Sequence, residues 1–311
     1  MKPVCLVGAT ASGKSAVAVA LAERMPAEIV TVDSMQVYRG MDIGTAKPGK
    51  RERLRVPHHL LDVAEVIEAY DAARFCRDAD EAVRAIRARG RCPILCGGTG
   101  FYLKAWLEGL GDAPTSDAAL RADLEAMPLG DLLEELAERD PETFAKIDRQ
   151  NPRRVVRAVE VIRLTGEAFS KQRADWTRRN PEGIRVVGLR RRTEDLRERM
   201  DRRVDRMFED GLVGEVEGLI GLGLERNRSA VQAIGYRQVI EHLRGRRDLA
   251  ATVELVKART RQYARRQMTW FRNQLAVEWI EVAADDRSDE IAARMAALLS
   301  GSGSPERVGQ V

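Results

Sequence analysis

The sequence predicts an α/β fold: a P-loop NTPase-like parallel sheet flanked by helices, with an all-helical insertion domain. Short aliphatic strands alternate with helical segments in the first part of the chain, and a glycine-rich loop joins the first strand to the first helix. From about residue 112 only helical periodicity is found, until strand-like residues return near 186. We therefore expect a P-loop-like core at 1–111 and 184–299, a helical insertion at 112–183 and a disordered tail at 300–311.

The expected elements follow in chain order. Val4–Val7 is predicted to be a buried strand, and the Ala/Val-rich segment 13–24 the helix that follows it. Further strands are expected at Glu28–Val32, Pro93–Cys96, Val186–Leu189 and Val277–Val282. Further helices are expected at Tyr70–Arg89, at Glu194–Glu209 behind a cap at Thr193, and at Leu212–Leu222, Leu249–Phe271 and Ile291–Leu299.

The composition is that of an ordinary globular protein. Apolar residues make up 44% of the 311 residues and charged residues 32%. We see neither an apolar run long enough for a membrane span nor a basic-then-apolar leader, and we expect a cytoplasmic protein. The four cysteines form no CxxC pair and are expected to be reduced thiols rather than metal ligands or disulfides: Cys5, Cys76, Cys92 and Cys96.

Charge is distributed unevenly, although the net charge is only +4. From Asp112 to Asp148 there are 11 acids and 3 bases, whereas Asn151–Arg192 contains 12 bases and 4 acids. Lys257–Arg272 contains 6 bases and no acid. The two basic blocks indicate a polyanionic partner, although charge runs are more often solvated helix faces.

The first loop fits the phosphate-binding pattern G-x-x-x-x-G-K-[ST] in full, after a strand and at the start of a helix. Backbone amides and the helix N-terminus would hold phosphate oxygens, Lys14 would reach the outer phosphate and the Ser15 hydroxyl would ligate Mg²⁺. The motif is typical of ATP- and other nucleotide-binding proteins, but an allylic diphosphate presents the same two linked phosphoryl groups. The residues predicted to bind phosphate are Gly8, Thr10, Ala11, Ser12, Gly13, Lys14 and Ser15.

Two further strands end in polar residues. Asp33 follows the second strand and Thr99 follows the third, so both are expected at the sheet edge that also carries the phosphate loop. Asp33 could hold Mg²⁺ for phosphoryl transfer, act as a general base, or cap a turn. Around Thr99, a tight turn with Phe101 and Tyr102 in the core is as well supported as a site residue.

Together these segments resemble the tRNA dimethylallyltransferase (tRNA isopentenyltransferase) family, bacterial type. They run in family order from the start of the chain to about residue 282. The stretch at Asp33–Pro48 is the most specific. The matching segments are GATASGKS (Gly8–Ser15), DSMQVYRGMDIGTAKP (Asp33–Pro48), PHHLLD (Pro57–Asp62), GGTGFYLKAWLEGL (Gly97–Leu110), AIGYRQ (Ala233–Gln238) and RRQMTWFR (Arg265–Arg272).

The resemblance implies a reaction. A dimethylallyl group would pass from dimethylallyl diphosphate to N6 of adenine 37, beside the anticodon of a tRNA, with Mg²⁺ as cofactor. Asp33 would accept the N6 proton, Thr99 would stabilise the departing oxygen and Lys14 the diphosphate; these three are the predicted catalytic residues. We also expect a monomer. The alternatives are a P-loop nucleotide or small-molecule kinase, a prenyltransferase acting on free AMP or ATP, and a non-catalytic RNA-binding ATPase.

The resemblance also implies contacts with tRNA. Arg153 stands where the family commonly has Gln, so we expect it to contact phosphate rather than a base. His58 and His59 are expected to be structural, and Trp270 and Phe271 to be packing residues. The predicted tRNA-binding residues are Asp33, Ser34, Met35, Gln36 and Thr99 at the target base, Arg121, Arg153, Arg154 and Arg157 in the insertion, and Gly235, Tyr236, Arg237, Arg265, Arg266, Gln267 and Arg272 in the core.

Overall fold

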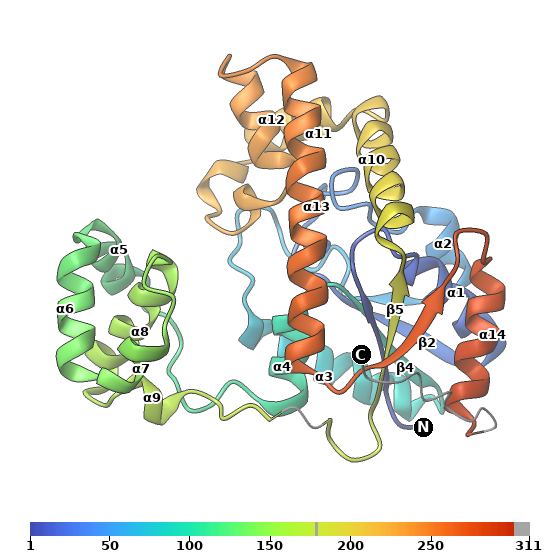
Figure 1. Cartoon of the computed structure of the whole chain (residues 1–311), viewed down its shortest axis with the longest axis horizontal. Helices are drawn as coiled ribbons and strands as arrows, with labels where there is room; N and C mark the ends of the chain where they lie inside the picture. Colours follow the sequence, from blue (N-terminus) through green and yellow to red (C-terminus); the bar gives the residue numbers. More distant parts are fainter. Residues whose placement is uncertain (178–179, 302–311) are drawn as a thin grey trace. The chain divides into compact units, whose positions relative to one another are not determined.

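The predicted parallel α/β fold is confirmed by a computed structural model, which describes residues 1–177 and 180–301. One sheet has the strand order β3-β2-β4-β1-β5-β6, and every neighbouring pair is parallel (Figure 1). Its strands are β1 (Val4–Gly8), β2 (Ala27–Val32), β3 (His58–His59), β4 (Cys92–Gly97), β5 (Arg185–Arg191) and β6 (Glu278–Val282).

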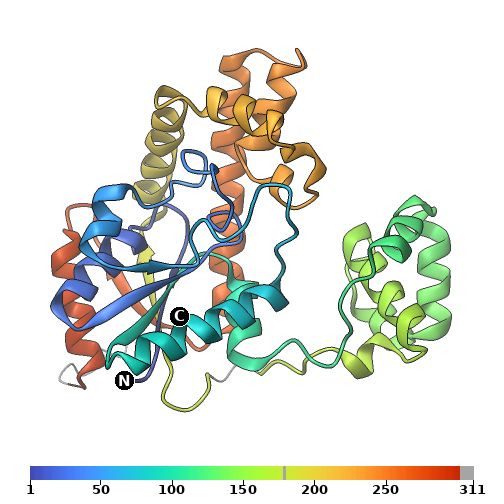
Figure 2. The same cartoon turned by 180° about the vertical axis from the view of Figure 1, so that it is seen from behind.

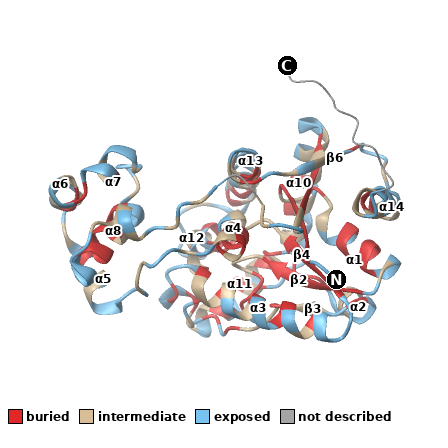
Figure 3. Cartoon of the chain, turned by 90° about the horizontal axis from the view of Figure 1, so that it is seen from below, coloured by how far each residue is buried: buried red, intermediate tan, exposed pale blue. Residues whose placement is uncertain are grey.

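Helices cover the sheet on both faces. The chain moves from β1 outward to β2 and then back to β4, so right-handed crossovers place α1 and α3 on opposite faces. Helix α1 packs against α14, and the buried side chains between them and the sheet form one apolar core (Figure 3). The helices near the sheet are α1 (Lys14–Arg24), α2 (Lys50–Arg55), α3 (Ala72–Ala88), α4 (Gly100–Glu108) and α14 (Ser288–Leu299).

A second group of helices lies between β5 and β6 in sequence. Helix α13 (Leu249–Gln274) packs against α10 and α12 and also contacts β1 (Figures 1 and 2). The group therefore approaches the sheet close to the glycine-rich loop that follows β1. Its other members are α10 (Thr193–Glu209), α11 (Leu212–Gly221), α12 (Tyr236–Leu243) and the short 3₁₀ turns η1 (Leu224–Arg226) and η2 (Ala230–Gln232).

The chain divides into two compact units, one formed by Met1–Leu107 with the chain from Arg178 onward and the other by Glu108–Thr177. The second unit is helical in its described part and has its own core, in which Leu124, Leu132 and Val159 are buried. It begins and ends a few residues before the bounds predicted for the insertion. Its helices are α5 (Ala118–Ala126), α6 (Leu129–Arg139), α7 (Pro141–Lys146), α8 (Pro152–Thr165) and α9 (Phe169–Gln172).

Several local predictions need correction. Helix α4 starts at Gly100, where the sequence indicated only a turn; Tyr102 is buried but Phe101 is 49% exposed, so only one of the two rings joins the core. Thr193 is the first residue of α10 rather than its cap, which is Arg192. Strand β3 is too short to give a periodic signal, and α2 and α12 were also not predicted. Most of the predicted tail at 300–311 lies outside the described residues.

The topology places the predicted site residues together. Strands β2, β4 and β1 are neighbours, so their carboxyl ends meet at one edge of the sheet. Asp33 follows β2, Thr99 follows β4 by two residues and the glycine-rich loop follows β1. No helix in the described part of the chain is long and apolar enough to cross a membrane.

Candidate active site

The glycine-rich loop between β1 and α1 forms the first part of the site. Gly8 has φ 148°, and a Cβ there would lie only 2.9 Å from the carbonyl oxygen of Leu189, so only glycine fits. Gly13, with φ 98°, caps α1 without a side-chain hydrogen bond. The first amides of α1 are therefore open to an anionic ligand, which is the geometry of a phosphate-binding loop.

Lys14 is the first residue of α1, and its ammonium donates to the Ala9 carbonyl at 2.7 Å. Burial lowers the pKa of Lys14 to about 8, and the nearby Arg203 adds to this effect, whereas Cys96 and Asp33 oppose it. The Lys14 ammonium thus loses its proton more readily than that of an exposed lysine. A bound diphosphate would place negative charge beside the Lys14 ammonium and so favour its charged form.

Two serines of the loop differ in exposure. Ser12 is buried, and its hydroxyl has no hydrogen-bond partner among the described residues. Ser15, in the first turn of α1, is exposed. The described residues contain no cluster of three or more His, Cys, Asp or Glu side chains that could hold a metal ion. A metal ion here would therefore need oxygens of a bound ligand in addition to the Ser15 hydroxyl.

Gln267 of α13 joins the loop to the neighbouring strand end. Its side-chain oxygen accepts from the amide of Thr10 at 2.8 Å, and its amide nitrogen donates to the Gly98 carbonyl at 2.8 Å. The residue is only 7% exposed. Inside the protein its amide braces the phosphate loop, and its tRNA contact stays a prediction.

Two arginines support the opposite side of the loop. Arg191, at the end of β5, donates to the Ser12 carbonyl at 2.9 Å, and Arg199 of α10 donates to the Ala11 carbonyl at 3.0 Å. A Cβ on Gly13 would lie 3.8 Å and 3.9 Å from their outer nitrogens. Both guanidinium groups thus place positive charge beside the loop, although that of Arg191 is also paired with Asp195 at 2.7 Å. Neither arginine was predicted, although Arg191 lies in the basic run at 190–192 and Arg199 lies in the basic helix α10 that follows it.

Asp33 begins the turn that follows β2, and one of its carboxylate oxygens accepts from the amides of Met35 at 2.9 Å and Gln36 at 3.3 Å. The predicted turn cap is thus present, and the second oxygen is left for a ligand. Burial raises the pKa of Asp33, while these two bonds and the positive charges of Lys14 and Arg203 lower it. A carboxyl with a raised pKa next to two cations is suited to accept a proton.

Gln36 lies near the Asp33 carboxylate in sequence, and Thr99 lies near it in space. The Thr99 hydroxyl oxygen accepts from the Ser34 amide at 3.0 Å, which ties the end of β4 to the turn after β2. Gln36 is 8% exposed, and its amide nitrogen donates to the Thr45 carbonyl at 3.0 Å. One of its two amide N–H donors is therefore used, and the second N–H and the carbonyl oxygen remain to meet a base. Ser34, Met35 and Thr99 are half-buried.

The predicted arginines of the helical unit fall into two pairs. Arg121 and Arg157 donate to the same oxygen of Glu160 at 3.2 Å and 2.8 Å, and Glu160 is fully buried. They hold the unit together at this buried acid. Arg153 and Arg154, in the first turn of α8, are exposed. Only this second pair presents guanidinium groups fully to solvent, where a phosphate contact is open to them.

The predicted residues of α12 and α13 also separate by exposure. Tyr236 is fully buried, and Gly235 before it is buried with φ 96°, so neither presents exposed surface in this structure, and their tRNA contact stays a prediction. Phe271 is buried as predicted, and Trp270 packs over Gly100, where a Cβ would lie 2.3 Å from its ring. The remaining predicted arginines lie at exposed positions: Arg237, Arg265, Arg266 and Arg272.

A cavity of about 560 Å³ lies beside the phosphate loop, between β5, α10 and α13. Its lining includes Ala9 and Ser12 of the loop. Aliphatic side chains alternate with arginines around it, a combination that suits a ligand with an anionic head and a short apolar part. The aliphatic lining residues include Leu189, Leu196, Met200, Ala264 and Met268, and the arginines are Arg190, Arg191, Arg197, Arg261, Arg265 and Arg272.

The family model described as IPP transferase matches residues 36–274 of this chain. The chain belongs to the IPP transferase family. Its relatives include the tRNA dimethylallyltransferase of Thiobacillus denitrificans, 46% identical over 302 residues (95% of this chain and 96% of the relative). Another is tRNA dimethylallyltransferase 2 of Geotalea daltonii, 43% identical over 289 residues (91% and 89%). The family predicted from the motifs is confirmed.

Solved structures agree with this membership of the IPP transferase family. The tRNA isopentenylpyrophosphate transferase of Bacillus halodurans has a TM-score of 0.71 and 38% identity, covering 96% of this chain and 97% of its own. A eukaryotic dimethylallyltransferase acting on tRNA has a TM-score of 0.77 and 27% identity, covering 97% of this chain and 79% of its own. The fold of this IPP transferase is thus that of enzymes in the same family.

Sequence reasoning missed Arg203 of α10, which is half-buried. Its guanidinium donates to the Thr45 carbonyl at 3.2 Å and influences the pKa of both Lys14 and Asp33. Burial lowers the pKa of Arg203, and the nearby Asp33 opposes this. This half-buried arginine, which influences both Lys14 and Asp33, adds positive charge where a leaving diphosphate would develop negative charge. The only sequence signal was its place in a basic helix.

Proposed function

We infer that this IPP transferase is a tRNA dimethylallyltransferase, which moves a dimethylallyl group from dimethylallyl diphosphate to N6 of adenine 37 in tRNA. The observation that carries the inference is the position of Asp33. Its carboxylate, whose pKa burial raises, lies close enough to the buried Lys14 ammonium for each to influence the pKa of the other. One site thus combines a base for an amine proton with a cation for a diphosphate.

The bonds formed and broken in the proposed reaction, and the proton that is released, are accounted for as follows. The N6 nitrogen attacks C1 of the dimethylallyl group, the N6–C1 bond forms and the C1–O bond to diphosphate breaks. Asp33 takes the N6 proton, and the diphosphate leaves with the electron pair of the broken bond. The amides of the loop, Lys14 and Arg203 are oriented before the reaction and stabilise the charge on the leaving group. A general base of this kind contributes roughly 10²–10⁴-fold.

Mg²⁺ is proposed as the cofactor on the chemistry of the donors present. Ser15 would hold it by its exposed hydroxyl, together with diphosphate oxygens. When bound, the ion would neutralise charge on the diphosphate as it leaves. Thr99, whose oxygen lies against the Ser34 amide, would orient the departing oxygen from the β4 side.

The RNA partner is proposed to bind with the exposed arginines. The target adenine must leave its stack to reach Asp33, at a cost of a few kcal/mol. Gln36 donates one amide N–H to Thr45, so its second N–H and its carbonyl oxygen can meet that base. Phosphate contacts are assigned to Arg153 and Arg154 of α8 and to Arg265 and Arg266 of α13, all of which are exposed.

The direct test is incubation with Mg²⁺, dimethylallyl diphosphate and unmodified tRNA, followed by nuclease digestion and mass spectrometry of the nucleosides. We expect one adenosine per tRNA to become heavier by one five-carbon unit, with AMP and ATP unmodified in parallel reactions. If only AMP or ATP were modified, the protein would still be a prenyltransferase, but RNA would not be its substrate. Phosphate release from ATP without any modified adenosine would instead indicate a kinase or ATPase.

Arg154→Ala is expected to weaken tRNA binding and to reduce the slope of log Kd against log salt by about 1, the value for one lost phosphate contact. The reason is that Arg154 is exposed in the first turn of α8. Filter binding at several salt concentrations measures the slope. Arg139→Ala removes a guanidinium that pairs with Glu135 in the acidic part of the same unit, and should leave the slope unchanged. Equal slopes in the two variants would mean that Arg154 does not contact a tRNA phosphate.

A further inference from the structure

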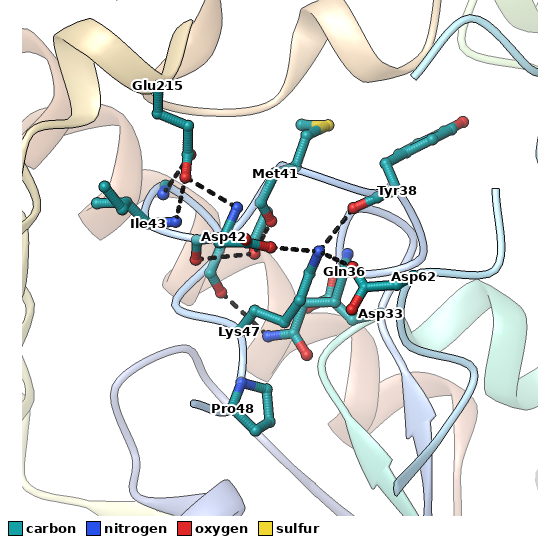
Figure 4. A network of polar contacts seen from close by, with 12 residues as sticks. Asp33, Gln36, Tyr38, Met41, Asp42, Ile43, Lys47, Pro48, Asp62 and Glu215 are labelled. Atoms are coloured by element: carbon teal, nitrogen blue, oxygen red, sulfur yellow. Dashed lines mark hydrogen bonds and ion pairs between the residues drawn. The ribbon is translucent and has the colours of Figure 1, made fainter. Parts of the chain in front are cut away.

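The second half of the segment 33–48 has no role in the proposed reaction, yet side-chain hydrogen bonds hold its backbone in place. Glu215 of α11 accepts from three consecutive amides of this loop, those of Asp42 at 3.0 Å, Ile43 at 2.7 Å and Gly44 at 3.2 Å (Figure 4). Oε2 takes the first two and Oε1 takes the third. A single carboxylate therefore fixes the turn at its tip.

Tyr236 of α12 completes this arrangement. Its hydroxyl donates to Oε1 of Glu215 at 2.6 Å, so the carboxylate accepts four hydrogen bonds. Burial and the Glu215 charge raise the pKa of Tyr236, and the hydroxyl remains a donor. The Tyr236 ring also packs against the loop, because a Cβ on Gly44 would lie 2.5 Å from it. The loop is thus pinned by hydrogen bonds and by close packing to the same two helices.

The pinned loop carries a carbonyl that two site residues share. The Thr45 carbonyl, one residue after Gly44, accepts from the Gln36 amide at 3.0 Å and from the Arg203 guanidinium at 3.2 Å. The Gln36 backbone amide in turn donates to Asp33. If the loop tip moved, the Thr45 carbonyl would move with it and would displace Gln36 and Arg203, which lie near the candidate base.

The other end of the loop is held separately. The Lys47 ammonium donates to the Tyr38 carbonyl and to Asp62, each at 2.6 Å, and pairs with Asp42 at 2.7 Å (Figure 4). Its side chain is only 1% exposed. Since this anchor does not involve Glu215, loss of the Glu215 contacts should loosen the tip at 42–45 without unfolding the segment.

We propose that Glu215 is a positioning residue, which with Tyr236 holds the loop at 42–45 so that Gln36 and Arg203 are placed correctly around Asp33. The proposal rests on the proposed function for its catalytic consequence, but not for its structural part. The hydrogen bonds of Glu215 among the described residues are to the loop at 42–44 and to Tyr236, away from the phosphate loop and Asp33. Its removal should lower the rate of transfer while leaving the phosphate loop able to bind diphosphate.

The variant Glu215→Gln tests this directly. An amide keeps one accepting oxygen and presents an NH₂ group where the other oxygen lay, so it must face backbone N–H donors in either orientation. We expect kcat for tRNA modification to fall at least about tenfold, because misplacement by ~1 Å can cost on the order of 10²-fold. The KM for dimethylallyl diphosphate and the Kd for inorganic diphosphate should stay within about twofold of the parent.

Glu217→Gln is the matched control, since Glu217 lies on the same helix, is exposed and undergoes the same change in charge. It should behave as the parent. Tyr236→Phe removes one of the four donors to Glu215 and should give a smaller loss of kcat, which provides a second measurement if Glu215→Gln does not fold. An unchanged kcat in Glu215→Gln, or a parallel loss of diphosphate binding, would overturn the proposal.

Hydrogen exchange separates this proposal from the proposed function. The amides of Asp42, Ile43 and Gly44 should exchange faster in Glu215→Gln than in Glu217→Gln, whereas strand amides should be unchanged. If the parent protein modifies no tRNA while this difference is present, the proposed function fails and the loop anchor stands. If the parent is active and the three amides exchange equally in both variants, the anchor fails alone.

Discussion

Asp33→Asn is expected to lower kcat for tRNA prenylation by roughly 10²–10⁴-fold, the usual contribution of a positioned general base. Asparagine keeps a side-chain oxygen for the Met35 and Gln36 amides, so the turn should survive. It has no basic oxygen for the N6 proton. Diphosphate binding should persist, because the loop amides and Lys14 are untouched. Single-turnover assays and a diphosphate titration measure the two quantities separately.

Asp71→Asn is a suitable control for this change. Asp71 caps α3 by accepting from the Arg74 amide at 2.8 Å, so it makes the same type of bond at a site that holds none of the predicted catalytic residues. Its substitution should leave kcat unchanged. Loss of diphosphate binding in Asp33→Asn would instead indicate that this carboxylate serves a metal ion, as in the kinase alternative.

The pH dependence of transfer tests the same assignment. Burial raises the pKa of Asp33, and a base acts only when ionised. The rate should therefore fall with decreasing pH at a higher pH than the ordinary carboxyl range would give. In Asp33→Asn this acidic limb should disappear from what activity remains.

The sequence predicted the sheet and the location of the site because both depend on local patterns. Buried parallel strands are short aliphatic runs, and residues that follow such runs must lie at one sheet edge. Asp33, Thr99 and the phosphate loop were placed correctly on that basis. Strand β3 could not be predicted, because two histidines carry no periodic signal.

The supporting contacts could not be predicted, because they join residues far apart in sequence. Gln267 braces the amide of Thr10 across 257 positions, and Glu215 holds Asp42 across 173. Nothing in the local sequence distinguishes an amide that braces a loop from one that reads a base. The same limit applies to Tyr236, since the family motif locates that residue but does not indicate that its ring is buried under Gly44.

Exposure also separates arginines that the sequence treated alike. Arg154 and Arg157 belong to one basic helix turn, yet Arg157 donates to the buried Glu160 and Arg154 faces solvent. The difference follows from the helical period: a residue three positions before a buried acid lies on the same face as that acid. With Glu160 fully buried, its neighbours at that spacing are drawn into the unit.

The second large effect concerns Lys14 and its pKa of about 8. Below that pH the ammonium is charged and binds an anion; above it, binding must also restore the lost proton. Isopentyl diphosphate suits this test, because it cannot react and its last phosphate proton leaves near about pH 6. Its affinity should therefore be nearly constant from about pH 7 to about pH 8. It should then fall, by up to about tenfold per pH unit, as calorimetry would show.

Lys14→Met removes both the charge and the titration. We expect the affinity at about pH 7 to fall roughly 10- to 100-fold, from the loss of a charge-assisted hydrogen bond worth ~1.5–3 kcal/mol. Between about pH 7 and about pH 9 the variant should show little further change, because the group that titrates in this range is gone. A decline with pH that persists in Lys14→Met would assign the titration to another group. Unchanged affinity in the variant would place the diphosphate elsewhere, with the arginine-lined cavity beside the loop as the next site to test.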